Sequence, residues 1–234
     1  REGVEWKRKE VHCDDKMVVK RFRMYGEGKN PLLRALRYCF CELVYLHHLL
    51  CDKYDVAFID STPPIQGLKL PIVRLFRKCP VVYNAQDLFP DTLSGTGLAK
   101  KGGLLWKIGS WVARVTFNNT DKIIAISEDI KRTLVEEKGI PANKVVVVYN
   151  WVDSDAVVPI AKEENPLFEE FGLNREKFHV VYAGNLGNAQ NINIVVDAAT
   201  RLRDNEDVVF VVFGSGGLEN DIRARIEAEG LKNL

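Results

Sequence analysis

The chain of 234 residues is long enough to bury a substantial core, and its 46% hydrophobic and 28% charged residues are ordinary for a globular protein. Its five cysteines are odd in number and form no C-x-x-C pair, which argues against a disulfide framework or a zinc site and for reduced thiols. No apolar run approaches the roughly 18 residues of a membrane span.

Charge divides the chain into two parts, although the net charge is only +1. Residues 1–150 carry 25 Lys and Arg against 17 Asp and Glu, whereas residues 151–234 carry 8 against 15. This asymmetry indicates two modules, of which the first faces an anionic partner or surface. Solvated charge without a partner is the alternative.

The first 150 residues alternate between predicted strands and helices. Short strands are expected at 4–7 and 17–19. Apolar residues recur at helical spacing over 32–50, and the basic side of this helix either faces solvent or contacts anionic lipid headgroups. Strands are expected at 56–60, 81–83, 122–126 and 145–149, of which the first and the last are expected to be buried. Helices are expected at 67–78, 104–117 and 127–138. This alternation is typical of β-α-β units around a parallel sheet.

The strand at 81–83 ends in the loop 84–92, where an apolar run changes abruptly into polar and acidic side chains. Asn84, Gln86 and Asp87 follow the strand, and Pro90 prevents further regular structure. Parallel α/β sheets place ligand chemistry at the carboxyl edge, so this loop is the first candidate site.

A linker is predicted at 151–166, where two prolines and several charged residues show no periodicity. Asp153 and Asp155 match a D-x-D pattern, but they lie in this acidic linker, so we expect no metal site there. A second module then has strands at 179–183 and 208–213, each followed by a glycine-containing loop and a helix. The first of these helices is expected at 191–203, and the second is expected to end at 228. Such a loop before a helix N-terminus favours phosphate, although each loop alone is also explained as a tight turn.

Other nucleotide and hydrolase classes do not fit these motifs. The first glycine loop reads G-x-x-G, not G-x-G-x-x-G, and no acidic residue ends the second strand, which excludes a nicotinamide dehydrogenase. No P-loop and no G-x-S-x-G elbow occurs either.

Four motifs, in order, resemble those of the family 4 glycosyltransferases of the GT-B fold, in the branch of bacterial capsule, O-antigen and colanic-acid transferases. They are YNAQDLFPD at 83–91, IAISE at 124–128, VYNWVD at 148–153 and YAGNLG at 182–187. The resemblance covers nearly the whole chain.

The resemblance implies an α/β protein of GT-B architecture, with two Rossmann-like parallel-sheet domains. Residues 1–150 would be the acceptor-binding domain without its first β-α unit, 151–166 the linker, and 167–234 the truncated start of the nucleotide-sugar-binding domain. The implied reaction is retaining transfer of a hexose or aminosugar from a UDP-linked donor to a polyprenyl-diphosphate-linked or growing surface polysaccharide. No metal or other cofactor and no nucleic acid is implied. The implied location is the cytoplasm, with contact with the inner face of the membrane left open.

By the same resemblance, the site residues fall into three groups. Gln86 and Asp87 would lie near the reacting sugar carbon, and Asn84 and Ser127 on the acceptor side. The donor would be bound by Gly184, Asn185, Gly187, Gln190, Gly214 and Ser215.

The chain departs from the family pattern in three places. Gln86 stands where many relatives have His, and an amide cannot transfer a proton. Asn185 and Gln190 replace an Arg and a Lys of the donor loop. The E-x₇-E motif is absent, so we expect a fragment that is inactive alone. A sugar-nucleotide epimerase of the same fold and a non-catalytic nucleotide-sugar-binding subunit are the alternatives.

Overall fold

The computed structural model describes residues 8–13, 16–22, 31–92 and 100–234. The strand predicted at 4–7 lies outside these residues. At the start of the described chain, β1 (Lys9–His12) pairs with β2 (Met17–Lys20) in an antiparallel hairpin. The strand predicted at 17–19 is therefore confirmed, whereas its partner was not predicted.

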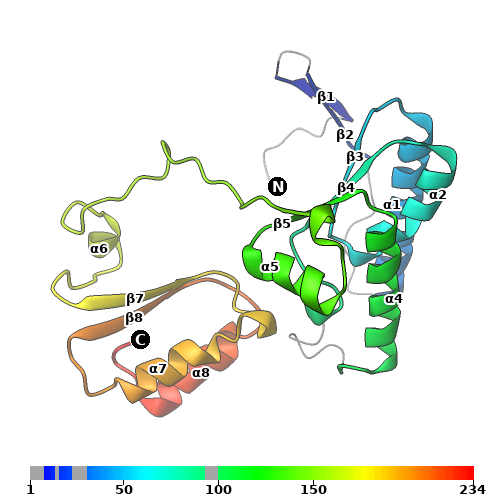
Figure 1. Ribbon diagram of the computed structural model, residues 1–234. Coiled ribbons are helices and arrows are strands. Elements are labelled where there is room, and N and C mark those ends of the chain that lie inside the picture. Colours follow the sequence, from blue (N-terminus) through cyan, green and yellow to red (C-terminus); the bar gives the residue numbers. More distant parts are fainter. Residues whose placement is uncertain (1–7, 14–15, 23–30, 93–99) are drawn as a thin grey trace.

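A four-stranded parallel sheet organises the first module (Figure 1). Its strands are hydrogen-bonded in chain order: β3 (Ala57–Asp60), β4 (Val81–Ala85), β5 (Lys122–Ala125) and β6 (Val145–Val147). In register, Asp60 lies opposite Asn84, and Ala85 opposite Ala125. The predicted β-α-β alternation is confirmed, and the parallel register brings the carboxyl ends of neighbouring strands to one edge.

Helices precede and connect these strands as the sequence predicted, although the helix predicted at 67–78 has different bounds. They are α1 (Pro31–Cys51), α2 (Leu70–Phe76), α4 (Leu104–Asn118) and α5 (Glu128–Arg132), the last continued by a π-helical turn over Thr133–Glu137. The helix expected from residue 67 begins earlier, as a 3-10 turn over Pro64–Lys69. Pro64 supports this early start, because proline fits the first helical turn.

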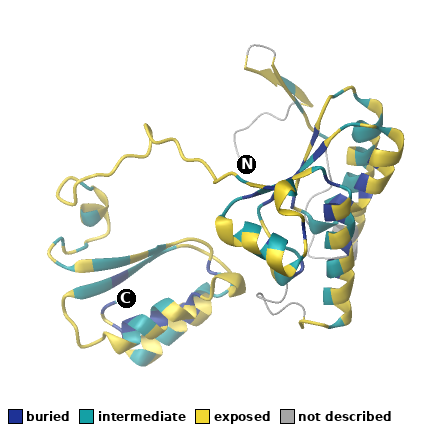
Figure 2. Ribbon diagram, viewed as in Figure 1, coloured by how far each residue is buried: buried dark blue, intermediate teal, exposed yellow. Residues whose placement is uncertain are grey.

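The core of the first module lies where the sheet meets its helices, and Figure 2 shows the buried residues concentrated there. The expectation that β3 and β6 are buried strands is wrong for part of each strand. Phe58 is 59% exposed and Val146 is 46% exposed, and Val148 and Tyr149 lie beyond the end of β6. Successive side chains of a strand point to opposite faces of the sheet, and those of β3 and β6 that point away from the helix-covered core remain exposed.

The second module is a smaller parallel unit. It comprises α6 (Leu167–Glu170), β7 (Phe178–Ala183), α7 (Asn193–Arg201), β8 (Val208–Phe213) and α8 (Glu219–Glu229). β7 and β8 pair in parallel, and α7 and α8 lie together on one face of them (Figure 1). A separate cluster that includes Val196, Phe210 and Ile222 forms its core. Residues 151–160 are exposed and without regular secondary structure.

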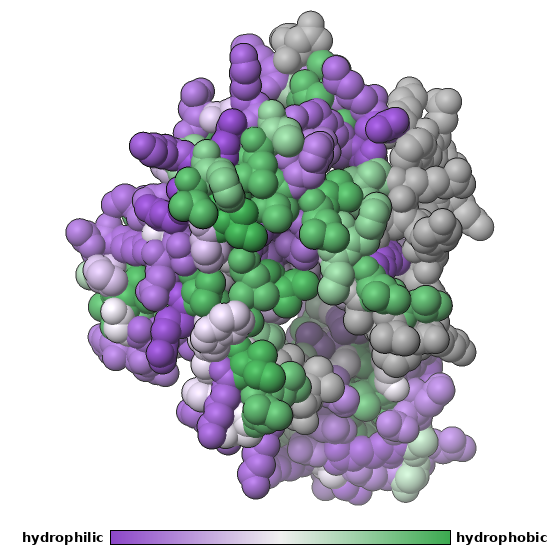
Figure 3. All heavy atoms as spheres, turned by 90° about the vertical axis from the view of Figure 1, so that its right-hand side faces the viewer, coloured by the Kyte–Doolittle hydropathy of each residue, from purple (hydrophilic) through white to green (hydrophobic). Residues whose placement is uncertain are grey.

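Apolar side chains gather on the outer face of α1, α2 and α4, interrupted by hydrophilic ones (Figure 3). The exposed apolar residues include Leu36, Phe40, Leu43, Leu75, Phe76, Leu104, Ile108 and Trp111. Among the described residues, no helix is both long and apolar enough to cross a bilayer.

Candidate functional site at the carboxyl ends of the strands

Two polar side chains meet where β3 and β4 end. Asp60 and Asn84 lie opposite each other in register and point away from the helix-covered core, since their strand neighbours Ile59 and Tyr83 are the buried ones. The Asn84 Nδ2 group donates to Asp60 Oδ1 at 3.4 Å, and the backbone N–H of Ser61 donates to the same oxygen at 2.8 Å. Asp60 therefore orients Asn84. No motif in the sequence had indicated this role for Asp60.

Asp87 is held through its backbone. Its N–H donates to Oγ of Ser61 at 3.4 Å, and Ser61 is buried. The Asp87 side chain remains exposed. The loops after β3 and β4 are thus joined below the carboxylate, which leaves that carboxylate free to meet a ligand.

Gln86 and Asn150 form a reciprocal amide pair. Gln86 Nε2 donates to Asn150 Oδ1, and Asn150 Nδ2 donates to Gln86 Oε1, both at 3.2 Å. The two residues are 64 positions apart, so sequence reasoning missed Asn150, although it lies in the quoted VYNWVD motif. The pair fixes the orientation of the Gln86 amide at the edge of the site.

Ser127 has a structural task at the same edge of the sheet. Its Oγ accepts the backbone N–H of Ile130 at 3.2 Å, which makes it the N-cap of α5, as its position after a strand predicted. The structure brings Asn84, Gln86 and Asp87 together, whereas the hydroxyl of Ser127 is engaged with its own helix.

The tyrosine beneath this cluster is buried and lies near two carboxylates. Burial, together with a smaller effect of the nearby carboxylates of Asp60 and Asp87, raises the pKa of Tyr83 to about 12. Both effects disfavour a phenolate. Tyr83 therefore stays neutral and packs edge-to-face on Phe117, with ring centroids 5.9 Å apart.

The two glycine loops of the second module interlock at the carboxyl ends of β7 and β8. Leu186 N–H donates to the Ser215 carbonyl at 2.9 Å, and Leu218 N–H donates to the Leu186 carbonyl at 2.9 Å. A Cβ on Gly214 would overlap the Gly184 carbonyl oxygen, and one on Gly216 would lie 2.5 Å from the Leu186 carbonyl oxygen. Contact between the loops is therefore sufficient reason for both glycines.

The first of these loops keeps free donors. No described residue accepts the backbone N–H groups of Asn185 and Gly187, and the side chains of Asn185 and Gln190 are exposed. Tyr182 Oη donates to the Asn185 carbonyl at 2.8 Å and fixes the loop from below. The loop can therefore present N–H groups to an anion.

The D-x-D motif closes a turn. Asp153 Oδ1 accepts the backbone N–H groups of Asp155 at 3.0 Å and of Ala156 at 3.1 Å. Across the described part of the chain, no group of three His, Cys, Asp or Glu residues is placed to hold a metal ion.

Two family models match the sequence. Glycosyltransferase Family 4 matches residues 14–156, and Glycosyl transferases group 1 matches residues 163–234. Among curated proteins, the chain is 30% identical over 65% of its length to a colanic acid biosynthesis glycosyl transferase, WcaI, of Escherichia coli K12, and 24% identical over 86% to the glycosyltransferase WbjE of Pseudomonas aeruginosa. These matches cover 38% and 50% of the two relatives.

Solved structures of two proteins share the fold. HepE of Anabaena, crystallised with UDP, is 18% identical and superposes with a TM-score of 0.61 over 87% of this chain and 52% of HepE. S. aureus TarM, crystallised with UDP and saccharide ligands, gives a TM-score of 0.52 over 96% of this chain and 38% of TarM. The family match and the parallel sheets agree with the expectation drawn from the four motifs. The chain belongs to glycosyltransferase family 4 and has the fold of part of a GT-B glycosyltransferase.

Proposed function

We propose that the protein is a retaining glycosyltransferase that moves a sugar from a UDP-linked donor to a lipid-linked or growing polysaccharide precursor. The observation that carries the proposal is the polar cluster of Asp60, Asn84, Gln86 and Asp87 at the carboxyl end of the family 4 sheet. HepE structures hold UDP or UDP-glucose, and an Escherichia coli relative, 25% identical over 80% of this chain, is named for galactosyl transfer to a GlcNAc-diphosphoundecaprenol. These names support the donor and acceptor classes.

For the donor, we assign the diphosphate to the loop 184–187. The free N–H groups of Asn185 and Gly187 are followed by the 3-10 turn Asn188–Gln190 and then by α7, whose first turn contains no acidic residue. By contrast, Glu219 and Asp221 already place negative charge in the first turn of α8. The positive N-terminal end of α7 would stabilise an anion, whereas the carboxylates in the first turn of α8 would repel it.

For the chemistry, we assign different tasks to Gln86 and Asp87. The bond between the anomeric carbon and the diphosphate oxygen breaks with its electron pair leaving on UDP. The acceptor oxygen bonds to the same face of that carbon, and its proton passes to the departing phosphate oxygen. Gln86 cannot accept the acceptor's proton, so its amide, held by Asn150, would orient sugar hydroxyls. The exposed Asp87 carboxylate would stabilise the positive charge that develops on the sugar in the transition state.

The test uses the complete gene product, since the chain spans only 38 to 50% of the curated relatives it matches. Acceptor-dependent release of UDP should fall at least about tenfold in Asp87→Asn. Asp129→Asn, an exposed substitution on α5, is the matched control and should leave the rate unchanged. We expect turnover to persist in EDTA, and no turnover by residues 1–234 alone. Equal rates for Asp87→Asn and wild type would remove Asp87 from the reaction.

We also propose that the apolar face of α1 and α4 rests on an anionic membrane surface. Leu36 and Leu43 are 58% and 66% exposed, and the first module carries the excess of positive charge. The double variant Leu36→Gln/Leu43→Gln should lose sedimentation with phosphatidylglycerol vesicles, whereas Leu202→Gln in the second module should keep it. If wild type does not sediment with these vesicles, the face is covered by protein instead.

A further inference from the structure

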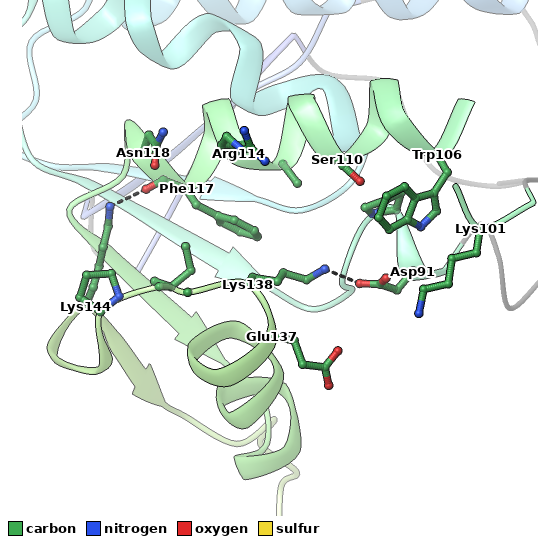
Figure 4. Close-up of a pocket in the computed structure, with 15 residues that line it drawn as sticks. Asp91, Lys101, Trp106, Ser110, Arg114, Phe117, Asn118, Glu137, Lys138 and Lys144 are labelled. Carbon is green, nitrogen blue, oxygen red and sulfur yellow. Dashed lines mark hydrogen bonds and ion pairs between the residues drawn. The ribbon is translucent and has the colours of Figure 1, made fainter. Parts of the chain in front are cut away.

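A basic pocket of about 560 Å³ lies between α4 and the turn that follows α5, apart from the polar cluster described above (Figure 4). Trp106, Ser110 and Arg114 line it from α4, and Lys138 lines it from the opposite side. Lys101 closes one end and Lys144 the other.

Positive charge exceeds negative charge in this pocket. Its lining contains four cationic side chains and two carboxylates, those of Asp91 and Glu137. Lys138 pairs with Asp91, and Lys144 donates to the Phe117 carbonyl. Within the described residues, Lys101 and Arg114 make no ion pair, so their charges remain available to an anion.

An unused donor lies in the same wall. The indole Nε1 of Trp106 is buried, and no described residue accepts its hydrogen bond. Buried N–H groups nearly always have an acceptor, because leaving one unpaired is unfavourable. Trp106 Nε1, Ser110 Oγ and the two unpaired cations together form a set of donors that lacks an acceptor.

We propose that this pocket is a second ligand site, for the phosphate or diphosphate group of an anionic compound. Phosphate oxygens satisfy several N–H and O–H donors at once, and guanidinium and ammonium groups bind them with charge-assisted hydrogen bonds. The group could come from a lipid headgroup or from a free phosphate compound. The proposal does not depend on the proposed transferase reaction.

The test is a titration of the ¹⁵N-labelled chain with inorganic pyrophosphate, followed on the Trp106 indole N–H signal, which Trp106→Phe identifies. We expect a saturable shift of this signal. The double variant Lys101→Gln/Arg114→Gln should weaken binding about tenfold or more. Both residues are exposed, so the fold should survive, and an unchanged unfolding temperature verifies this.

Lys107→Gln is the matched control, because Lys107 is an exposed cation on the same helix that does not line the pocket. It should bind pyrophosphate like wild type. Displacement of pyrophosphate by phosphatidylglycerol vesicles would assign the site to a headgroup, and no displacement would assign it to a free phosphate compound. No shift of the Trp106 signal, or equal weakening by Lys107→Gln, would overturn the proposal.

Discussion

The contact between Gly67 and Thr116 gives a direct test of how the first module is held together. Gly67 lies in the 3-10 turn after the candidate site, and Thr116 is a buried residue of α4. A Cβ added at Gly67 would overlap Thr116 Oγ1 and lie 2.5 Å from Thr116 Cβ and 2.6 Å from Cγ2. Alanine at this position therefore requires the turn and the helix to separate.

The cost follows from these distances. Heavy atoms essentially never approach a Cβ closer than 3.0 Å, and Thr116 Oγ1 lies nearer to the added Cβ than either Thr116 carbon. The two elements must therefore move apart by more than about 1 Å, and overpacking of this kind costs about 1–3 kcal/mol. The hydrogen bond from Thr116 Oγ1 to the Val112 carbonyl, 2.9 Å long, would also be strained. We expect Gly67→Ala to lower the free energy of unfolding by about 3 kcal/mol.

Urea unfolding followed by tryptophan fluorescence measures this change, because Trp106 and Trp111 both lie on α4. Gly217→Ala is the control, since a Cβ there meets nothing within 4 Å, and it should change stability by less than about 0.5 kcal/mol. Thr116→Ala should relieve part of the clash, so the double variant should be more stable than additivity predicts. If Gly67→Ala is no more destabilising than Gly217→Ala, the packing argument is wrong.

Three further changes test the surroundings of the site. The raised pKa of Tyr83 contributes stability below pH 10 that is lost as pH rises from 10 to about 12, by at most about 2–3 kcal/mol, and Tyr83→Phe should remove this pH dependence of urea unfolding. In the wild type, the Lys69 ammonium is 2.6 Å from the Glu42 carboxylate and its side chain is 4% exposed. Glu42→Gln removes this counter-charge and should lower the free energy of unfolding by about 3 kcal/mol in the same assay. Asn150→Asp keeps an acceptor for the Gln86 amide and Asn150→Ala does not, so NMR should find that amide ordered only in the former.

Each of these has a result that would contradict it. Equal loss of stability between pH 8 and 11.5 in Tyr83→Phe and wild type would show that other groups govern alkaline unfolding. A Glu42→Gln protein as stable as wild type would mean that Lys69 reaches water. An ordered Gln86 amide in Asn150→Ala would show that other neighbours hold it.

Local sequence patterns predicted the regular elements well because each depends on nearby residues. Helical spacing predicted α1 and α4, and Ser127 predicted the start of α5. The predicted burial of β3 and β6 was partly wrong, because an apolar strand sequence does not show which face of the sheet the helices cover.

The candidate site was predicted only in part, for a related reason. Asn84, Gln86 and Asp87 lie within four positions at the end of β4, so the sequence shows them together. Asp60 joins them through the register of β3 and β4, and Asn150 joins them from the segment that follows β6. Pairs of this kind depend on tertiary structure, and no local motif identifies them.

The amide pair of Gln86 and Asn150 also sets the length of a tether. Beyond Asn150 the chain is exposed until Lys162, whose Nζ donates to the Lys177 carbonyl at 2.8 Å and so belongs to the second module. About twelve residues therefore separate the two anchored points, which limits the distance between them to roughly 40 Å. A tether of this length keeps each module at a high effective concentration near the other. Breaking one pair of amides would lengthen it by the few residues back to β6, so a side-chain contact in the site also controls how far the two sheets can separate.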